Sequence, residues 1–209
     1  MEQKNDFSTI MTGRRSVRVY DETYKIPHEE MLEMIKEATT APSSVNMQPW
    51  RFVVAESEEA KEILRPLIRF NTRQNDTSSA MVMIFGDMQC YEYGEEIYNQ
   101  AYESGKMPKE VRDQQLAAII PYYKSFSREE MNDVVKVDSS LAAMQFMLVA
   151  RDHGYETNPI GGFEADQLAE AFGLDKDLYV PVIILSIGKA VEEGYESVRL
   201  APEKITTFE

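Results

Sequence analysis

Cysteine and histidine are scarce in this sequence. Its 209 residues contain one cysteine, Cys90, and two histidines, His28 and His153. A single cysteine cannot close a disulfide within the chain, so nothing points to an oxidising compartment and we expect a cytoplasmic protein. The histidines are far apart and lack the spacing of a motif such as HExxH, so we expect no metal site. Cys90 has no basic neighbour in the sequence to lower its pKa, and we expect a structural role for it.

Long apolar runs and positive charge are also lacking. No apolar stretch approaches the roughly 20 residues of a membrane-spanning helix, and residues 1–6 lack the apolar core of a signal peptide, so we expect neither membrane insertion nor secretion. Lys and Arg number 22 against 36 Asp and Glu, for a formal net charge of -14. Such a chain repels nucleic acid and anionic membranes, so neither is an expected partner. Length and composition suit one folded domain over residues 1–209.

One short segment is strongly basic against this background. Three arginines and a serine lie within residues 14–18, which read Arg-Arg-Ser-Val-Arg. The planar fork of an arginine matches phosphate or carboxylate oxygens, and a serine hydroxyl can complete such a site. The alternative is the basic end of a short helix, since positive side chains are favoured in the last helical turn. The segment alone does not decide between these two interpretations.

The spacing of apolar residues indicates the secondary structure. Helical periodicity and helix-ending glycines predict helices at residues 7–12, 28–40, 58–69, 134–150 and 164–172. Apolar and β-branched runs predict strands at residues 51–55, 80–86 and 180–189. Prolines, glycines and polar residues predict irregular structure at residues 41–50, 71–79 and 158–163. Residues 91–130 are polar and aromatic, and we expect helices there outside the core, whose tyrosines either pack or cover a substrate opening.

Two segments point to a partner surface. Apolar residues cover almost the whole circumference of the 134–150 helix, so it must be buried on all sides, either within its own chain or against a second subunit. Its small residues, Met and Phe suit close packing between subunits, and we expect a dimer. Residues 192–209 lack core-forming periodicity but end in a β-prone segment at 205–208. Such a tail needs an external surface.

Two loops carry groups suited to a flat, polar ligand. Residues 42–50 offer serine, asparagine and glutamine side chains between two prolines, which suits the edge of a polar heterocycle, and Trp50 is expected to anchor the loop in the core. Residues 159–162 end in two glycines, so the backbone could approach a flat ligand closely. Either loop taken alone reads equally well as an ordinary turn.

The order and spacing of these segments are more specific than any one of them. The set comprises Arg14–Arg18, Pro42–Trp50, Phe70-Asn71, Asn158–Phe163 and Ser197–Pro202. Together they resemble the nitroreductase family of FMN-dependent oxidoreductases over most of the chain. The resemblance implies an α+β fold in which helices flank a mostly antiparallel central sheet. It also implies a homodimer in which the C-terminal strand of each subunit completes the sheet edge of the other.

The resemblance also implies the residues of two FMN sites per dimer. By analogy Arg14, Arg15, Ser16 and Arg18 hold the phosphate, the ribityl chain and the pyrimidine edge, and Arg199 reaches the phosphate from the tail. The other subunit supplies Ser43, Ser44 and Asn46. Asn71 bonds the pyrimidine side of the flavin, and the ring lies against Pro159, Ile160, Gly161 and Gly162. Gln74 stands where some relatives carry a lysine near the flavin, and Gly161 stands where some carry a glutamate.

The implied chemistry is the transfer of a hydride from NADH or NADPH through FMN to a nitroaromatic, a quinone or a similar acceptor. Positioning carries this reaction, so no catalytic acid or base is expected. One shared ring face implies ping-pong turnover, and residues 91–130 are where relatives set substrate preference. Three alternatives stay open at this point: dehalogenation or enone reduction by the same flavin, a non-catalytic flavin-binding protein, and a module that binds a phosphorylated partner. The role of Asp138, near the start of the 134–150 helix, also stays open.

Overall fold

A four-stranded antiparallel sheet forms the centre of the protein. The computed structural model describes residues 6–209. The strands are β1 (Trp50–Ala55), β2 (Ala80–Asp87), β3 (Glu156–Ile160) and β4 (Tyr179–Gly188), in the spatial order β1-β2-β4-β3. All eight residues of β2 are buried because this strand lies inside the sheet with both faces covered.

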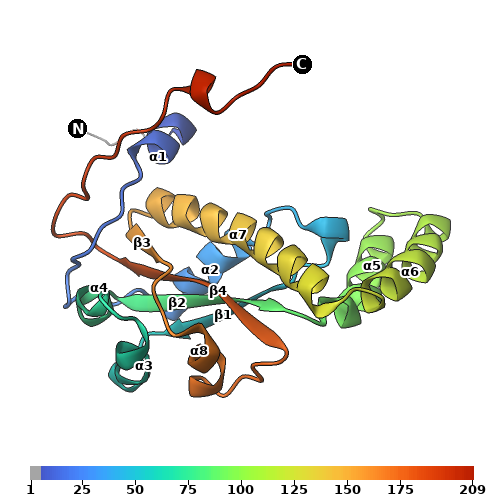
Figure 1. Cartoon of the computed structure of the whole chain (residues 1–209), viewed down its shortest axis with the longest axis horizontal. Helices are drawn as coiled ribbons and strands as arrows, with labels where there is room; N and C mark the ends of the chain where they lie inside the picture. Colours follow the sequence, from blue (N-terminus) through green and yellow to red (C-terminus); the bar gives the residue numbers. More distant parts are fainter. Residues whose placement is uncertain (1–5) are drawn as a thin grey trace.

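Eight α-helices surround the sheet within residues 6–209 (Figure 1). They are α1 (Phe7–Gly13), α2 (His28–Ala38), α3 (Glu58–Leu64), α4 (Thr72–Thr77), α5 (Gly94–Glu103), α6 (Lys109–Lys124), α7 (Arg128–Asp152) and α8 (Ala165–Ala171). The alternation of side chains along β2 divides the core in two: Ala80, Val82 and Ile84 pack with α2 and α7. Met81, Met83 and Phe85 pack with the opposite layer, which contains α3 and α8. The predicted α+β class is confirmed.

Several predicted elements are confirmed and three are wrong. The predicted strands correspond to β1, β2 and β4, and the predicted helices at 7–12, 28–40 and 164–172 correspond to α1, α2 and α8. The helix predicted at 58–69 ends at Leu64, and a single 3₁₀ turn that contains Pro66 follows it. Residues 72–77 form α4 instead of an irregular segment. Asn158–Ile160, also predicted as irregular, belong to the edge strand β3, where a proline is tolerated.

The helix α7 is longer than predicted and is not buried on all sides by its own chain. It begins at Arg128 with a capping box on Ser127, so Asp138 lies well inside the helix and not near its start. One face packs on the sheet and on α2, through residues such as Phe146. The opposite face leaves Val137, Leu141 and Met144 exposed by 63%, 44% and 40%. A single subunit therefore does not bury this helix on all sides.

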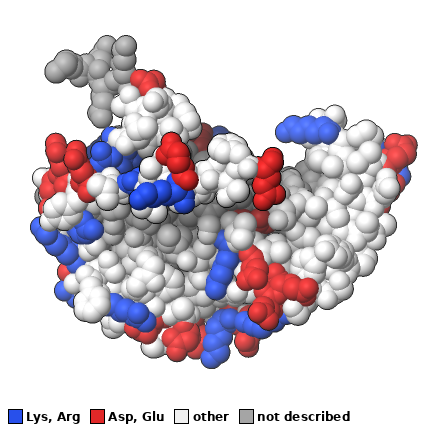
Figure 2. All heavy atoms as spheres, turned by 45° about the horizontal axis from the view of Figure 1, so that its top comes forward, with Lys and Arg blue, Asp and Glu red and all other residues white. Residues whose placement is uncertain are grey.

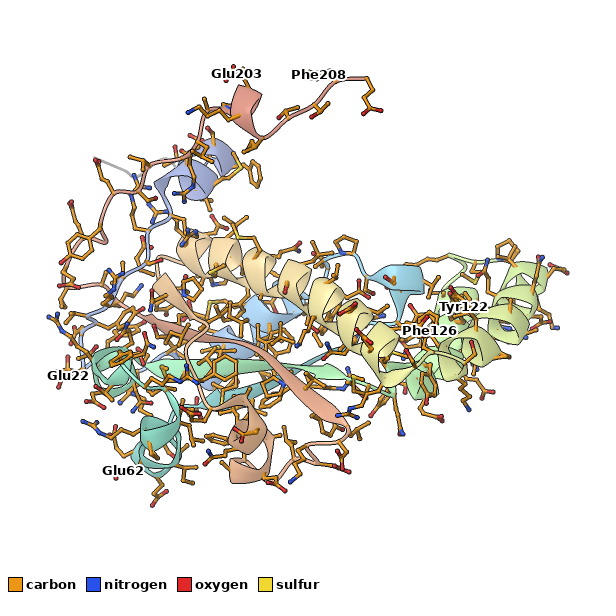
Figure 3. All side chains as sticks on the ribbon, in the orientation of Figure 1. Glu22, Glu62, Tyr122, Phe126, Glu203 and Phe208 are labelled. Carbon is orange, nitrogen blue, oxygen red and sulfur yellow. The ribbon has the colours of Figure 1, made fainter. Side chains whose placement is uncertain are left out.

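The helices α5 and α6 extend from one end of α7, as Figure 1 shows. They share a small apolar cluster with the start of α7 and the turn before α5; Cys90, Tyr98, Tyr123 and Val135 belong to it. Burial raises the pKa of the Cys90 thiol to about 12, which agrees with the structural role predicted for it. Some aromatic residues of this segment stay outside the cluster: Tyr122 is exposed, and its ring stands edge-on to Phe126 at a centroid distance of 4.7 Å (Figure 3).

The C-terminal tail runs beside α1 and then leaves the body of the subunit (Figure 1). Its short 3₁₀ turn, Pro202–Lys204, is exposed, and Phe208 is 93% exposed beyond it (Figure 3). The tail buries no apolar side chain in its own core, as the sequence predicted. No helix in the described part of the chain is long and apolar enough to cross a membrane.

Candidate functional site

The basic segment at residues 14–18 is fixed beside the edge strand β3. The backbone N–H of Val17 donates to the carbonyl of Thr157 at 3.1 Å, and Ser16 forms a parallel bridge to the same residue. The segment begins where α1 ends: Arg14 is the C-cap residue, and Arg15 donates to the carbonyl of Thr12 in the last turn at 3.0 Å, so part of the basic segment also serves the helix end. Arg14, Arg15 and Arg18 are all half-buried. We call these three arginines, with Arg199, the anion site.

Most of the charges that act on Arg14 are positive. Burial, and then the charge of Arg199, lowers the pKa of Arg14, and Arg15 and Arg151 act in the same direction. Glu156 is the carboxylate that opposes them, and it already forms an ion pair with Arg151. The Nη1 atom of Arg14 is buried without a hydrogen-bond partner. A buried, unpaired donor among like charges is the arrangement expected of a site that binds an anion.

The tail brings Arg199 to this site by crossing it closely. The guanidinium of Arg18 lies 5.3 Å from the centre of the Tyr195 ring. A side chain on Gly194 would place its Cβ 2.6 Å from the Cβ of Arg15, so only glycine allows the crossing. Arg199 is exposed and donates to the Ser197 hydroxyl at 2.7 Å. The arginines from the two ends of the chain therefore meet in one subunit.

A second group of predicted residues continues from the anion site. Thr157 leads along β3 to Gly161 and Gly162, and a Cβ built on Gly162 would lie 3.7 Å from Nδ2 of Asn71. The side chain of Gln74 is buried and donates to the Asn71 oxygen at 3.1 Å, which fixes the amide of Asn71. A Cβ on Gly161 would meet nothing within 4 Å, so this position is open.

The two remaining members of the 159–162 segment differ from each other. Pro159 is half-buried on β3, whereas the side chain of Ile160 is 2% exposed and packs in the core. Only the main chain of Ile160 is therefore available to a ligand. The structure brings together Arg14, Arg15, Ser16, Arg18, Asn71, Gln74, Pro159, Gly161, Gly162 and Arg199 along one edge of the sheet.

Ser43, Ser44 and Asn46 are not part of that group in the same subunit. They lie in a turn beside α5 and α6, away from α1 and the tail at the other side of the molecule (Figure 1). The backbone N–H and the hydroxyl of Ser44 donate to the carboxylate of Asp138 at 2.9 and 3.1 Å. Burial raises the pKa of Asp138, and the two bonds from Ser44 oppose this shift. The residues predicted to come from a second subunit are thus separated from the anion site in one chain.

An apolar groove lies over the exposed face of α7. It encloses about 610 Å³ and is lined mainly by residues of α1 and α7, among them Phe7, Ile10, Leu141 and Met144. Figure 2 shows the molecule hollowed between the end that carries α1 and the end formed by α5 and α6, with Lys and Arg gathered near α1. A contiguous apolar surface of this kind is typical of a subunit interface.

Sequence reasoning missed four residues of the site: Arg151, Glu156, Gly194 and Tyr195. Arg151 and Glu156 are separated by a helix end and a turn, and nothing in their spacing predicts an ion pair. Of the four, only Gly194 could have been noticed in the sequence, because a glycine within a charged tail can indicate a close approach of the backbone to another segment. In the described residues, no group of three His, Cys, Asp or Glu side chains could hold a metal ion.

Comparison with known proteins identifies the family. Residues 11–189 match the nitroreductase family. YdgI of Bacillus subtilis (strain 168), named as a NAD(P)H nitroreductase, is 52% identical over 208 residues and 100% of both chains. The CLA biosynthesis enone reductase of Lactiplantibacillus plantarum is 38% identical over 98% of this chain and 94% of that protein. A solved nitroreductase in complex with FMN, from Exiguobacterium sibiricum 255-15, has a TM-score of 0.96 and 54% identity, with 100% of this chain and 99% of that chain covered. The chain therefore belongs to the nitroreductase family, a family of oxidoreductase enzymes, as its motifs predicted.

Proposed function

We propose that this protein is a homodimeric NAD(P)H-dependent oxidoreductase that holds FMN in the site described above, with one domain over residues 1–209. The observation that carries the proposal is the buried, unpaired Nη1 atom of Arg14 among further arginines. A phosphate brings about two negative charges and strong acceptor oxygens to such a donor. The FMN complex of the Exiguobacterium sibiricum relative supports this choice of anion.

The residues along the sheet edge fit the other parts of FMN. Ser16 and Arg18 would hold the ribityl chain and the pyrimidine edge, and Asn71, fixed by Gln74, would bond the ring. The main chain at 159–162 and the open position of Gly161 leave room for a flat ring. When bound, FMN supplies the capacity to accept and release a pair of electrons. The chain binds and orients, so it needs no acid or base of its own.

The second subunit completes each site in this proposal. Ser43, Ser44 and Asn46 of one subunit would contact the cofactor held by the anion site of the other, because one chain separates these groups. The apolar groove over α7 provides the contact surface, and the tail of each subunit would complete the sheet edge of the other. Cytoplasmic location stays a prediction from the single cysteine.

The acceptor is proposed to be a nitroaromatic, a quinone or a similar compound that is reduced in ping-pong turnover with NADH or NADPH. An enone is the second candidate, because the Lactiplantibacillus plantarum relative is an enone reductase. A pocket of about 360 Å³ beside the 44–46 turn supports uncharged acceptors in either case. Its lining has no charged side chain and consists of Val45, Asn46, Ile97, Tyr98, Ala101, Met107, Val111 and Gln115.

The absorption spectrum of the purified protein tests the proposal. We expect flavin bands, or bands gained after FMN is added, that bleach when NADH or NADPH is mixed in without oxygen and recover when an acceptor is added. A panel of nitroaromatics, quinones and enones then ranks the acceptors by kcat/KM. Protein that has no flavin bands and gains none with FMN would contradict the proposal. Bound flavin that does not bleach would instead identify a non-catalytic flavin-binding protein.

A further inference from the structure

Asp138 lies in the middle of α7 and is buried without a compensating charge. Its side chain is 3% exposed, and its pKa is affected by burial and by Ser44 but by no neighbouring cation. Each carboxylate oxygen accepts one hydrogen bond, and both bonds come from Ser44. Burying a carboxylate without a cation is unfavourable for folding. The residue therefore needs an explanation other than the stability of its helix.

The segment that Asp138 holds is strained. Val45, Asn46 and Gln48 have positive φ angles of 45°, 57° and 47°. For a β-branched residue such as Val45, this left-handed conformation is an outlier, because the side chain crowds the backbone. Asparagine tolerates this conformation, but a β-branched residue adopts it only when the surrounding structure holds it in place.

Two tyrosines hold the same turn from the other side. The hydroxyl of Tyr98, on α5, donates to the carbonyl of Val45 at 3.0 Å. The hydroxyl of Tyr123, on α6, donates to the carbonyl of Ser44 at 3.3 Å. Three helices thus fix one short turn, while the residues Ser44, Val45 and Asn46 remain exposed. The turn is therefore held by contacts inside its own subunit, and its exposed side can contact a ligand or another subunit.

We propose that Asp138 is a positioning residue that fixes the 44–46 turn in the shape required by the cofactor site of the partner subunit. This inference rests on the proposed function, in which Ser44 and Asn46 contact FMN held by the other chain. In this inference Asp138 acts through Ser44, which donates to both of its oxygens. Its role is to keep a strained, exposed turn ready before the cofactor binds.

Substitution of Asp138 separates positioning from a direct role of its charge. Asp138→Ala removes both acceptors and should raise the Kd for FMN, measured by titrating flavin-free protein, by roughly tenfold to a hundredfold. Asp138→Asn keeps an acceptor for the Ser44 N–H and a polar partner for its hydroxyl, and should stay within about threefold of the wild type. Asp133→Ala, an exposed aspartate on the same helix, is the matched control and should leave the Kd unchanged.

The outcomes are distinguishable. If Asp138→Asn weakens FMN binding as much as Asp138→Ala does, the charge itself acts on the cofactor and the positioning role is wrong. The same conclusion follows if Asp138→Ala binds FMN as tightly as the wild type does. If Asp138→Ala does not fold, Ser44→Ala replaces it; an unchanged Kd in that variant would contradict the inference. Wild-type protein that binds no FMN would contradict the proposed function instead.

A mixed dimer tests whether Asp138 serves the partner. Arg14→Ala and Asp138→Ala chains with different tags are refolded together, and dimers that carry both tags are isolated. In such a dimer one site combines both defects, while the other joins the intact anion site of one chain to the intact turn of the other. We therefore expect one FMN per mixed dimer at wild-type Kd, whereas neither parent dimer has such a site. A mixed dimer without a wild-type site would show that Asp138 acts within its own subunit, contrary to the inference.

Discussion

Replacement of Arg14 by methionine should stabilise the ligand-free protein and weaken its binding of FMN. The Nη1 atom of Arg14 is buried without a partner, and the charges of Arg199, Arg15 and Arg151 all disfavour its positive charge. Methionine keeps an unbranched side chain that can fill the same space but removes the charge and the unpaired donor. The two effects have opposite signs because the arginine is unfavourable without the phosphate and favourable with it.

The expected changes in stability and in FMN affinity follow from whether the Arg14 guanidinium has a hydrogen-bond partner. A buried donor without a partner costs about 1–3 kcal/mol, so the free energy of unfolding of the ligand-free variant should rise by about 1 kcal/mol. For a chain of this length, that change corresponds to an increase in Tm of roughly 2–4 °C. Loss of a hydrogen bond to a charged group should weaken FMN binding by about 1.5–3 kcal/mol, or roughly tenfold to a hundredfold in Kd.

Both quantities are measured on flavin-free protein. Thermal unfolding followed by circular dichroism gives Tm, and titration with FMN, followed by quenching of flavin fluorescence, gives Kd. The gain in Tm should shrink with added salt, because salt screens the repulsion between the arginines. Arg65→Met is the matched control: it removes an exposed arginine that pairs with Asp76, and it should leave Kd unchanged. A variant of Arg14 that loses stability while keeping its affinity for FMN would refute this account of the anion site.

Four further substitutions test the same site. Arg18→Ala and Arg199→Ala should each weaken FMN binding by about 1.5–3 kcal/mol, and unchanged cofactor content in both would show that the anion site is misplaced. Glu156→Gln removes the opposing carboxylate and should lower the Kd for FMN at neutral pH. Burial raises the pKa of Glu156, so the difference from the wild type should vanish as the pH falls through that pKa, and a difference that persists in acid would contradict this assignment. Gly194→Val should push the tail off Arg15 and, combined with Arg199→Ala, should add little to the loss of affinity; additive losses would contradict it.

The parts of the fold that local pattern determines could be predicted from the sequence. The strand at 80–86 reads as uniformly apolar because β2 is covered on both faces. Gly13 is the last residue of α1, and Gly173 follows α8, so both glycines mark helix ends. The errors arose where tertiary contacts override local preference. Residues 72–77 are polar, yet α4 buries Gln74 and Thr77 by giving their polar atoms partners. The proline in 158–163 suggested a loop, but an edge strand accepts it.

Some residues of the candidate site could also be predicted from the sequence, and others could not. The arginines, Asn71 and the glycines carry their chemistry in their residue types, so the sequence motifs alone could indicate them. Glu156 and Asp138 could not be assigned in this way, because a carboxylate gains its role from what lies across from it in space. The carboxylate of Glu156 faces the charges of three arginines, Arg151, Arg14 and Arg15. Asp138 accepts hydrogen bonds from Ser44, which lies 94 residues away in the sequence.

The position of the exposed face on α7 connects the two halves of the proposed site. Asp138 holds the 44–46 turn, and Arg151, near the end of the same helix, lies at the anion site, so about 20 Å of helix separates them at 1.5 Å per residue. Met144, the exposed residue near the midpoint between them, lies on the apolar face that the partner is proposed to cover. A two-fold axis at Met144 would pair the two α7 helices antiparallel and set Asp138 of each chain level with Arg151 of the other. The groups that one subunit keeps apart would then meet at both ends of the proposed interface, so one helix would both carry that interface and support both halves of the proposed site.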